Sequence, residues 1–353
     1  MKNAQKVVQI AFTYIGTIVG AGFATGREVL QFFTQYGKWG TITIVLASIL
    51  FIWLGTKMML LAQKIKAESY EDLNRQLFGV HIGKILSFFT LIILIGVNSV
   101  MLAGAGSVFS EHLGMNYQTG LWITIISTFF LLHRGMKGII QLNSIVVPLM
   151  LTISLVIIVN TIYSPQSANF ITLESDFSML SIWAAPLLYT SFNLSMSQAV
   201  LVPMGGMIEN RKVIIWGGIL GGIGIGFMLL AAHFALSSQM PGIMQYEIPM
   251  GNIARQLGHA IQLIYVTLIF MEIFSTFVAD IYGVTLQLKQ YIPVSAKIIS
   301  IFILMICYTT SQFGFSSLLS LLYPIFGLFS ALWTVLLIAY KSTEIPAIPK
   351  SVS

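Results

Sequence analysis

Charged residues are scarce in this chain. Asp, Glu, Lys and Arg make up 8% of its 353 residues, whereas a soluble domain carries roughly 25%. Hydrophobic residues reach 56%, and the mean hydropathy is +0.87. A soluble fold of this size cannot bury so much apolar side chain. The composition therefore excludes a cytosolic enzyme and a nucleic-acid-binding protein, and it indicates a polytopic helical membrane protein.

Cysteine and catalytic motifs are also nearly absent. The single cysteine, Cys307, lies in an apolar run, which excludes a disulfide framework, a thiolate metal site and a redox CxxC motif. The five histidines show no metal-ligand spacing, and the sequence contains no nucleophile elbow, Walker loop or HExxH motif. No small-residue cleavage site follows Lys2 and Lys6, so we expect no cleaved signal peptide. We predict no enzyme activity, no resident cofactor and no obligate protein partner.

Long apolar stretches are what the sequence has instead. Lipid offers the backbone no hydrogen-bond partners, so each spanning stretch is expected to be a helix of about 17–28 residues. Ten such stretches occur, of which the fourth and ninth are short: 7–34, 39–62, 84–110, 119–133, 139–163, 179–203, 213–238, 259–288, 295–312 and 316–340. We predict an all-α protein with one transmembrane domain over 1–340 and a short cytoplasmic tail over 341–353.

The basic residues indicate the orientation. If the N-terminus is cytoplasmic, 15 of the 18 Lys and Arg residues fall in cytoplasmic segments. Lys38 and Arg255 fall outside, and Arg27 lies within a span. This asymmetry is typical of the positive-inside rule, and ten spans return the C-terminus to the cytoplasm. The net charge of +6 therefore reflects topology, and we expect a lipid bilayer rather than nucleic acid as the surrounding partner.

A weak internal repeat divides the chain. Two amphipathic connections, 64–83 and 240–258, are about 175 residues apart, and Val29-Leu30 falls on Val200-Leu201 at an offset of 171. Each half holds five spans, and an odd number inverts the second half relative to the first. We predict inverted repeats over about 1–165 and 175–340, an arrangement found in many secondary transporters with interrupted helices.

The first span contains an unusual cluster of glycines. They are Gly16, Gly20, Gly22 and Gly26. Glycine costs about 1 kcal/mol relative to alanine inside a helix. Close helix packing would explain the first two, but the cluster continues and is followed by Arg27 and Glu28, and charges deep in a bilayer are functional or mutually paired by default. We predict an unwound segment near 20–26, whose N–H groups attract an anionic group such as a carboxylate.

Polar residues mark the third and sixth spans. The stretch 190–198 in the sixth span includes Asn193 and Ser195. Hydrogen bonds between helices would explain it, but it lies opposite the first break at the repeat offset, so we predict a second break here. Asn98 lies in the middle of the third span and is a candidate ligand contact. The glycines near it are better explained by close helix packing.

The eighth span carries hydroxyl and carboxyl groups. Ser275 and Thr276 follow Glu272 by one turn. Such hydroxyls usually bond to the preceding turn, but with the carbonyl of residue 272 and carbonyls of a broken first span they would form an all-oxygen cage for a hard cation. Glu272 could titrate as a proton site, pair with Arg27, or stay neutral and buried. Asp280 could line the inner exit or form a structural ion pair.

These residues resemble a known family. The pattern Gly16-x-x-Val19-Gly20-x-Gly22 resembles the unwound first helix of the amino acid–polyamine–organocation (APC) superfamily, whose members have the LeuT-type fold with broken helices 1 and 6. The fuller string from Val19 to Glu28 is similar to that of the bacterial YkvI family of membrane proteins within it. The motif covers only the first span, while span number and topology extend the resemblance over nearly the whole chain. The resemblance implies a location in the bacterial plasma membrane.

The resemblance also implies two binding sites. A sodium ion would be held by the carbonyls of Gly16, Val19 and Glu272 and by the hydroxyls of Ser275 and Thr276. A substrate carboxylate would meet the N–H groups of Ala21 and Gly22. The remaining substrate-site residues would be Gly20, Phe23, Asn98, Phe192, Asn193 and Ser195. Coupling or gating would fall to Arg27, Glu28, Glu272 and Asp280.

Two features bear on the ion and the solute. Some proton-coupled relatives place a lysine of helix 5 at the sodium position, and residues 139–163 contain no lysine, which favours sodium over protons. Glu28 and Glu272 depart from the superfamily pattern. A carboxylate near an anion site repels an anionic ligand unless Arg27 offsets it, which leaves room for a cationic, zwitterionic or neutral solute.

We therefore expect an ion-coupled secondary transporter of a small amino-acid-like or related polar solute, driven by sodium or alternatively by protons. Helices 1, 2, 6 and 7 would rock against helices 3, 4, 8 and 9, and the connection 240–258 would act as an outer lid. One alternative is a ligand sensor on the same scaffold that binds without transporting. Another is a channel or a membrane-embedded enzyme.

Overall fold

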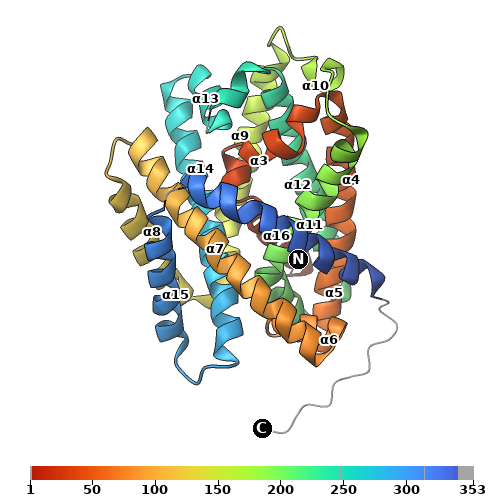
Figure 1. Cartoon of the computed structure of the whole chain (residues 1–353), viewed down its shortest axis with the longest axis vertical. Coiled ribbons are helices and arrows are strands. Elements are labelled where there is room, and N and C mark those ends of the chain that lie inside the picture. Colours follow the sequence, from red (N-terminus) through yellow and green to blue (C-terminus); the bar gives the residue numbers. More distant parts are fainter. Residues whose placement is uncertain (1, 247, 314, 341–353) are drawn as a thin grey trace.

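The computed structural model describes residues 2–246, 248–313 and 315–340, and this part of the chain contains helices and no strands (Figure 1). The predicted tail, 341–353, lies outside the described residues. In chain order the helices are α1 (Lys2–Ile18), α2 (Ala21–Ala24), α3 (Arg27–Phe32), η1 (Thr34–Tyr36), α4 (Lys38–Leu50), η2 (Phe51–Gly55), α5 (Thr56–Ile65), α6 (Tyr70–Phe78), α7 (Val80–His112), α8 (Tyr117–Leu132), α9 (Gly135–Ile162), α10 (Asn169–Thr172), α11 (Met179–Met207), α12 (Arg211–Ser237), η3 (Gly242–Gln245), α13 (Pro249–Gln256), α14 (His259–Lys289), α15 (Ala296–Ser311) and α16 (Phe315–Ala339).

The ten predicted spans all coincide with helical segments. Within the described residues, five helices are long and apolar enough to cross a membrane: Lys38–Ile65, Val80–Ser110, Gly135–Ile162, Arg211–Ser237 and His259–Lys289. The first of these joins α4 and α5 through the single π-helical turn η2. The predicted short spans are α8 and α15, with 16 residues each. The number of crossings and the inverted repeat stay predictions.

The predicted break of the first span is confirmed. Helix α1 ends at Ile18, the short α2 follows, and α3 begins at Arg27. The chain turns into α3 at Gly26, whose φ of 84° lies in the left-handed region. A residue with a Cβ atom is strained in that region, so glycine is the natural residue at this turn.

The predicted break of the sixth span is wrong. Helix α11 runs without interruption through the polar stretch 190–198. Two of its polar side chains bond back to their own helix: Asn193 Nδ2 donates to the Tyr189 carbonyl (3.0 Å) and Ser197 Oγ to the Leu194 carbonyl (3.1 Å). A polar side chain that finds a partner one turn back needs no unwound segment.

The broken first helix lies inside the bundle. Helix α1 contacts α12, α9, α11 and α14. In Figure 1, α8 and α15 lie along one side of the molecule and α4 and α5 along the other. Helix α6 lies at one end, and α10 and α13 lie at the other; we call these the α6 end and the α13 end.

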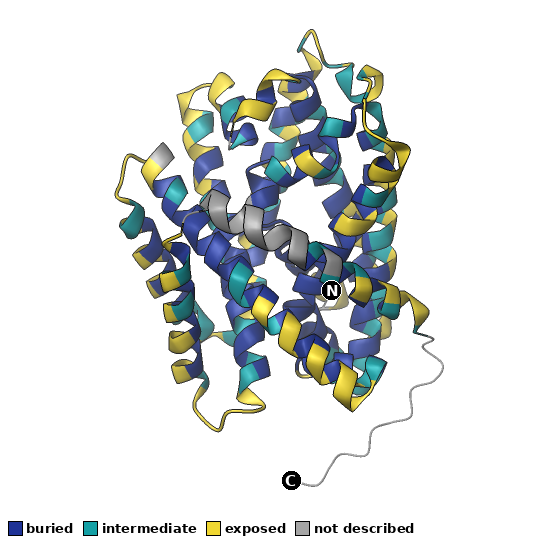
Figure 2. Ribbon diagram, in the orientation of Figure 1, coloured by how far each residue is buried: buried dark blue, intermediate teal, exposed yellow. Residues whose placement is uncertain are grey.

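Burial follows this arrangement. Buried residues fill the interior, and exposed residues lie on the outer faces (Figure 2). Many exposed side chains are large and apolar, for example Trp53, Phe88, Phe130 and Phe302. Water would not favour such a surface, whereas lipid accepts it. The outer faces therefore suit a bilayer.

Candidate functional site

Two contacts hold the broken first helix on the side of the α13 end. Tyr265 of α14 donates its hydroxyl to the Ala24 carbonyl at 2.9 Å. The backbone N–H of Met250, in α13, donates to the Thr25 carbonyl at 3.0 Å. Carbonyls that α2 cannot pair internally thus find donors on other helices.

The residues predicted to bind a cation come together where α1 ends. Thr276 Oγ1 of α14 lies 3.2 Å from the Gly16 carbonyl oxygen and 3.3 Å from that of Val19. The Ser275 hydroxyl donates to the Glu272 carbonyl at 3.1 Å. Both hydroxyl side chains are buried. The arrangement offers neutral oxygens from two elements, which is the donor type that a hard cation prefers.

Asn143 of α9 lies beside this oxygen cluster and was not predicted. A Cβ atom added to Gly16 would overlap the Asn143 amide, so the two residues are in direct contact. Asn143 is fully buried, and neither amide atom has a hydrogen-bond partner among the described residues. A polar amide in the apolar fifth span is the sequence signal that could have singled it out.

A small cavity adjoins the oxygen cluster. Of the predicted residues it is lined by Gly20, Glu28, Phe192, Asn193 and Thr276. Sequence reasoning missed the other lining residues, which are Thr17, Ile18, Val97, Met101 and Met196. The space available to the centre of a water-sized sphere is about 10 Å³, which is room for about one water molecule. Thr276 belongs to both the oxygen cluster and the cavity.

Several predicted residues lie outside that lining. Asn98 is fully buried and donates its amide to the Leu94 carbonyl at 2.8 Å. Ser195 is buried, and its hydroxyl has no partner among the described residues. Ala21 begins α2, and Gly22 follows it in direct contact with the carboxyl group of Glu28.

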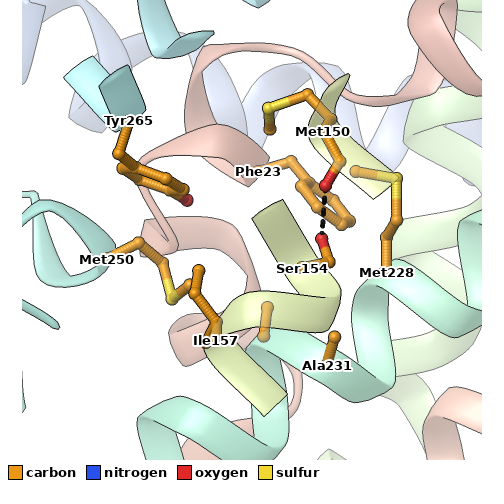
Figure 3. Close-up of a pocket in the computed structure, with 9 residues that line it drawn as sticks. Phe23, Met150, Ser154, Ile157, Met228, Ala231, Met250 and Tyr265 are labelled. Carbon is orange, nitrogen blue, oxygen red and sulfur yellow. Dashed lines mark hydrogen bonds between the residues drawn. The ribbon is translucent and has the colours of Figure 1, made fainter. Parts of the chain in front are cut away.

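Phe23 lines a second small pocket, shown in Figure 3. This pocket lies between α2, α9, α12, α13 and α14, and three methionines supply much of its wall: Met150, Met228 and Met250. Its one hydroxyl from α9, Ser154 Oγ, donates to the Met150 carbonyl at 2.8 Å. Most of the lining residues are apolar, and Phe23 adds an aromatic ring to them.

The predicted coupling residues differ in their surroundings. Arg27 Nη1 donates to the Met244 and Tyr246 carbonyls, at 3.2 and 3.0 Å. Arg27 is therefore engaged with the segment before α13. The Glu272 carboxyl group is buried without a hydrogen bond of normal geometry in the described part of the chain.

Asp280 lies two turns farther along α14, on the same face as Glu272. It is buried, and its Oδ2 also has no partner among the described residues. The sequence left two roles open for Asp280, lining the inner exit or forming a structural ion pair. The described residues contain no ion pair with Asp280. An ionised carboxylate in such a position is costly, and a cation close to it would lower that cost.

Comparison with known proteins identifies the family of this chain. It is 38% identical over 341 residues to the uncharacterized membrane protein YkvI of Bacillus subtilis (strain 168), covering 95% of this chain and 96% of that protein. The chain belongs to the YkvI family. A second similar protein, the uncharacterized protein YyaD of the same organism, is 26% identical over 326 residues and covers 92% of the chain and 94% of YyaD. No family model matches the chain.

Solved structures place this member of the YkvI family among proteins of LeuT-type fold. MhsT in complex with L-phenylalanine superposes with a TM-score of 0.69 at 15% identity, covering 92% of this chain and 88% of that one. A Na⁺-coupled sialic acid symporter gives 0.72 at 13% identity, covering 94% and 79%. Mhp1, a nucleobase-cation-symport-1 family transporter, gives 0.61 at 13%, covering 94% and 76%. At such identities the comparison establishes the fold.

Proposed function

We propose that this protein is an ion-coupled secondary transporter of a small polar solute. A sodium ion would bind between the carbonyls of Gly16 and Val19 and the Thr276 hydroxyl, completed by the Ser275 hydroxyl and the Glu272 carbonyl. The solute would bind in the adjoining cavity. The observation that carries the proposal is the position of Thr276, which touches the break of the first helix and also lines the cavity.

The fold supports the same conclusion. Solved structures with a similar fold include a Na⁺-coupled sialic acid symporter and a nucleobase-cation-symport-1 family transporter. A broken helix beside an oxygen cluster is suited to ion-coupled alternating access. We further propose that the α6 end faces the cytoplasm of a bacterial cell, because basic residues such as Lys64, Lys66 and Arg75 lie there. Protons remain the second candidate ion, favoured by the buried carboxyl groups of Glu272 and Asp280.

The experiment measures sodium binding on the purified full-length protein. Thermal unfolding in sodium chloride is compared with that in choline chloride, since an ion at 100 times its dissociation constant stabilises by about 2.7 kcal/mol. We expect sodium to stabilise the wild type and to have no effect on the variant that combines Ser275→Ala with Thr276→Ala. Thr267→Ala is the control, because Thr267 is exposed on the same helix and bonds to the preceding turn.

Two outcomes redirect the proposal. If the double variant keeps the full sodium effect, the assigned cation site is wrong. If the wild type responds to pH and not to sodium, the coupling ion is a proton. Accumulation of a solute in sealed vesicles under an ion gradient separates a transporter from a sensor, which binds without accumulating, and from a channel, which conducts without coupling.

A further inference from the structure

The cavity beside Thr276 contains a carboxyl group that belongs to the protein. Glu28 stands in the first turn of α3, is 6% exposed and lines the cavity. Its side chain lies against Gly22: a Cβ atom added to that glycine would overlap Oε1 and come within 2.6 Å of Cγ. The space beside the Gly22 backbone, where a solute carboxylate was expected, is therefore taken by the Glu28 side chain.

The cavity has an acidic group but no basic one. Among the described residues that line it, Glu28 is the one with an ionisable side chain. The neighbouring Arg27 extends away to the Met244 and Tyr246 carbonyls. A second carboxylate entering this cavity would meet a like charge at short range in a poorly hydrated setting, which is unfavourable, whereas a cationic group would be attracted.

The remaining walls suit an apolar body. They include Ile18, Val97, Met101, Phe192 and Met196. Methionine side chains adapt to irregular ligands, and an aromatic ring such as that of Phe192 interacts favourably with an ammonium group. The free space is about 10 Å³ for a water-sized sphere, so the cavity admits a primary ammonium group, which is close to water in size, and the apolar body requires these walls to move apart.

We propose that the solute is a primary amine with an apolar body and no carboxylate, and that its ammonium group binds to Glu28. This inference rests on the proposed function, because it names the substrate class of the same site. The carboxylate that an amino acid would bring with it is supplied here by the protein. Specificity then follows from charge: Glu28 attracts the amine and disfavours the corresponding amino acid.

The test uses two sets of matched compounds on the full-length protein in sodium chloride. One set is phenethylamine, phenylalanine and 3-phenylpropionate; the other is 3-methylbutylamine, leucine and 4-methylpentanoate. Within each set the apolar body is constant and the charged groups change. We expect the amine to raise the unfolding temperature and to bind at least tenfold more tightly than its amino acid, with no effect of the acid.

A variant locates the effect. Glu28→Gln should weaken amine binding at least tenfold while sodium still stabilises the protein, because the proposed sodium ligands do not include Glu28. Glu174→Gln is the control, since Glu174 is exposed and pairs with Lys38 far from the cavity. Amine binding unchanged in Glu28→Gln overturns the proposal.

The wild-type comparison stands on its own if the Glu28 variant fails to fold. Tighter binding of the amino acids, or no stabilisation by either amine, overturns the inference. Transport is scored separately in sealed vesicles, with sodium added outside to give an inward gradient. Accumulation of the amino acids would support the transporter and reject the amine, whereas amines that bind to Glu28 without accumulating would support the amine and reject the transporter.

Discussion

At the scale of single residues, the contact between Gly16 and Asn143 controls the shape of the proposed cation site. The Gly16 carbonyl faces Thr276, while its Cα packs against the Asn143 amide and lies near Val147. A side chain at position 16 would have to push α9 away from α1. The glycine is therefore required by its neighbour on α9.

This contact predicts a compensating pair. Gly16→Ala should destabilise the protein by about 1–3 kcal/mol, the usual cost of overpacking, and weaken sodium binding. Adding Asn143→Ala should restore part of both, because the overlapping amide is gone. Thermal unfolding with and without sodium measures the coupling between the two changes. Strictly additive effects would contradict the predicted contact.

Sequence reasoning reached some of these residues and not others. Glycine, serine and threonine are out of place in an apolar span, so Gly16, Ser275 and Thr276 could be singled out, and the structure brings them together. The apolar lining of the cavity, such as Val97 and Met101, has no such signal. Apolar side chains look alike on the lipid face and in a binding cavity, and only tertiary packing distinguishes them.

At the scale of elements, the amphipathic connection 64–83 contains α6, which joins three other helices at one point. Asn74 of α6 donates to Ser87 of α7 (3.1 Å) and to Gln198 of α11 (3.3 Å). It accepts a hydrogen bond from Trp333 of α16 at 2.9 Å. All four side chains are buried, so this junction depends on complete pairing of its polar groups.

Removing the central amide should loosen this junction. We expect Asn74→Leu to lower stability by about 2 kcal/mol or more, because several buried polar groups lose their partner at once. Thermal unfolding in detergent measures the loss. Asn160→Leu serves as the control, since Asn160 is exposed and bonds only to its own helix. Equal effects of the two changes would count against the junction.

A lysine closes the end of α16. Lys57 Nζ of α5 donates to the carbonyls of Leu337, Ile338 and Tyr340 at 2.9, 3.2 and 2.9 Å. The last carbonyls of a helix have no partners within it, and a cation there is favoured by the helix dipole. Helix α16 is thereby fixed to α5 across the α6 end.

Lys57→Met should free that helix end. We expect amide exchange at residues 337–340 to become roughly tenfold faster, which corresponds to about 1.4 kcal/mol of lost local stability. Hydrogen exchange read by mass spectrometry on the intact protein gives the result. Lys297→Met, on the exposed surface of α15, should leave that exchange unchanged; a similar acceleration there would point to a general charge effect.

The predicted break of the sixth span, which α11 does not show, illustrates where element prediction fails. The polar stretch 190–198 could unwind or could bond back to its own helix, and either outcome can give a polar side chain a hydrogen-bond partner. In the structure the second occurs, as with Asn193 and Tyr189. The first span had no such choice, because its glycines carry no side chain with which to stabilise the helix and Gly26 adopts a positive φ. The sequence therefore predicts one break securely and cannot decide the other.

At the scale of the whole molecule, the segment 240–258 is fastened over the broken first helix. Arg27 donates hydrogen bonds to the carbonyls of Met244 and Tyr246, and the Met250 N–H donates to the Thr25 carbonyl. The pocket of Figure 3 lies next to this contact and is walled by Met250. These contacts would hold the predicted outer lid closed, and its role as a lid stays a prediction.

Loss of the Arg27 contacts should open the lid. The chain has a single cysteine, so Cys307→Ser removes all background thiol labelling. In that variant, Ser154→Cys places one reporter thiol in the pocket of Figure 3. Because hydrogen bonds from a charged group contribute about 1.5–3 kcal/mol, we expect Arg27→Gln to speed labelling by a membrane-impermeant thiol reagent at least tenfold. Arg255→Gln, an exposed residue of α13, should not. Unchanged labelling in Arg27→Gln would mean that other contacts keep the segment closed.

The shared position of Thr276 has a consequence for the energetics of transport. One side chain touches the proposed ion ligands and the solute cavity, so ordering it for one ligand prepares it for the other. Thermodynamic reciprocity then requires that the solute tighten sodium binding by the same factor by which sodium tightens solute binding. Each ligand would bind weakly in the absence of the other. The protein with a single ligand bound would therefore be rare, which would suppress the leak of either ligand alone.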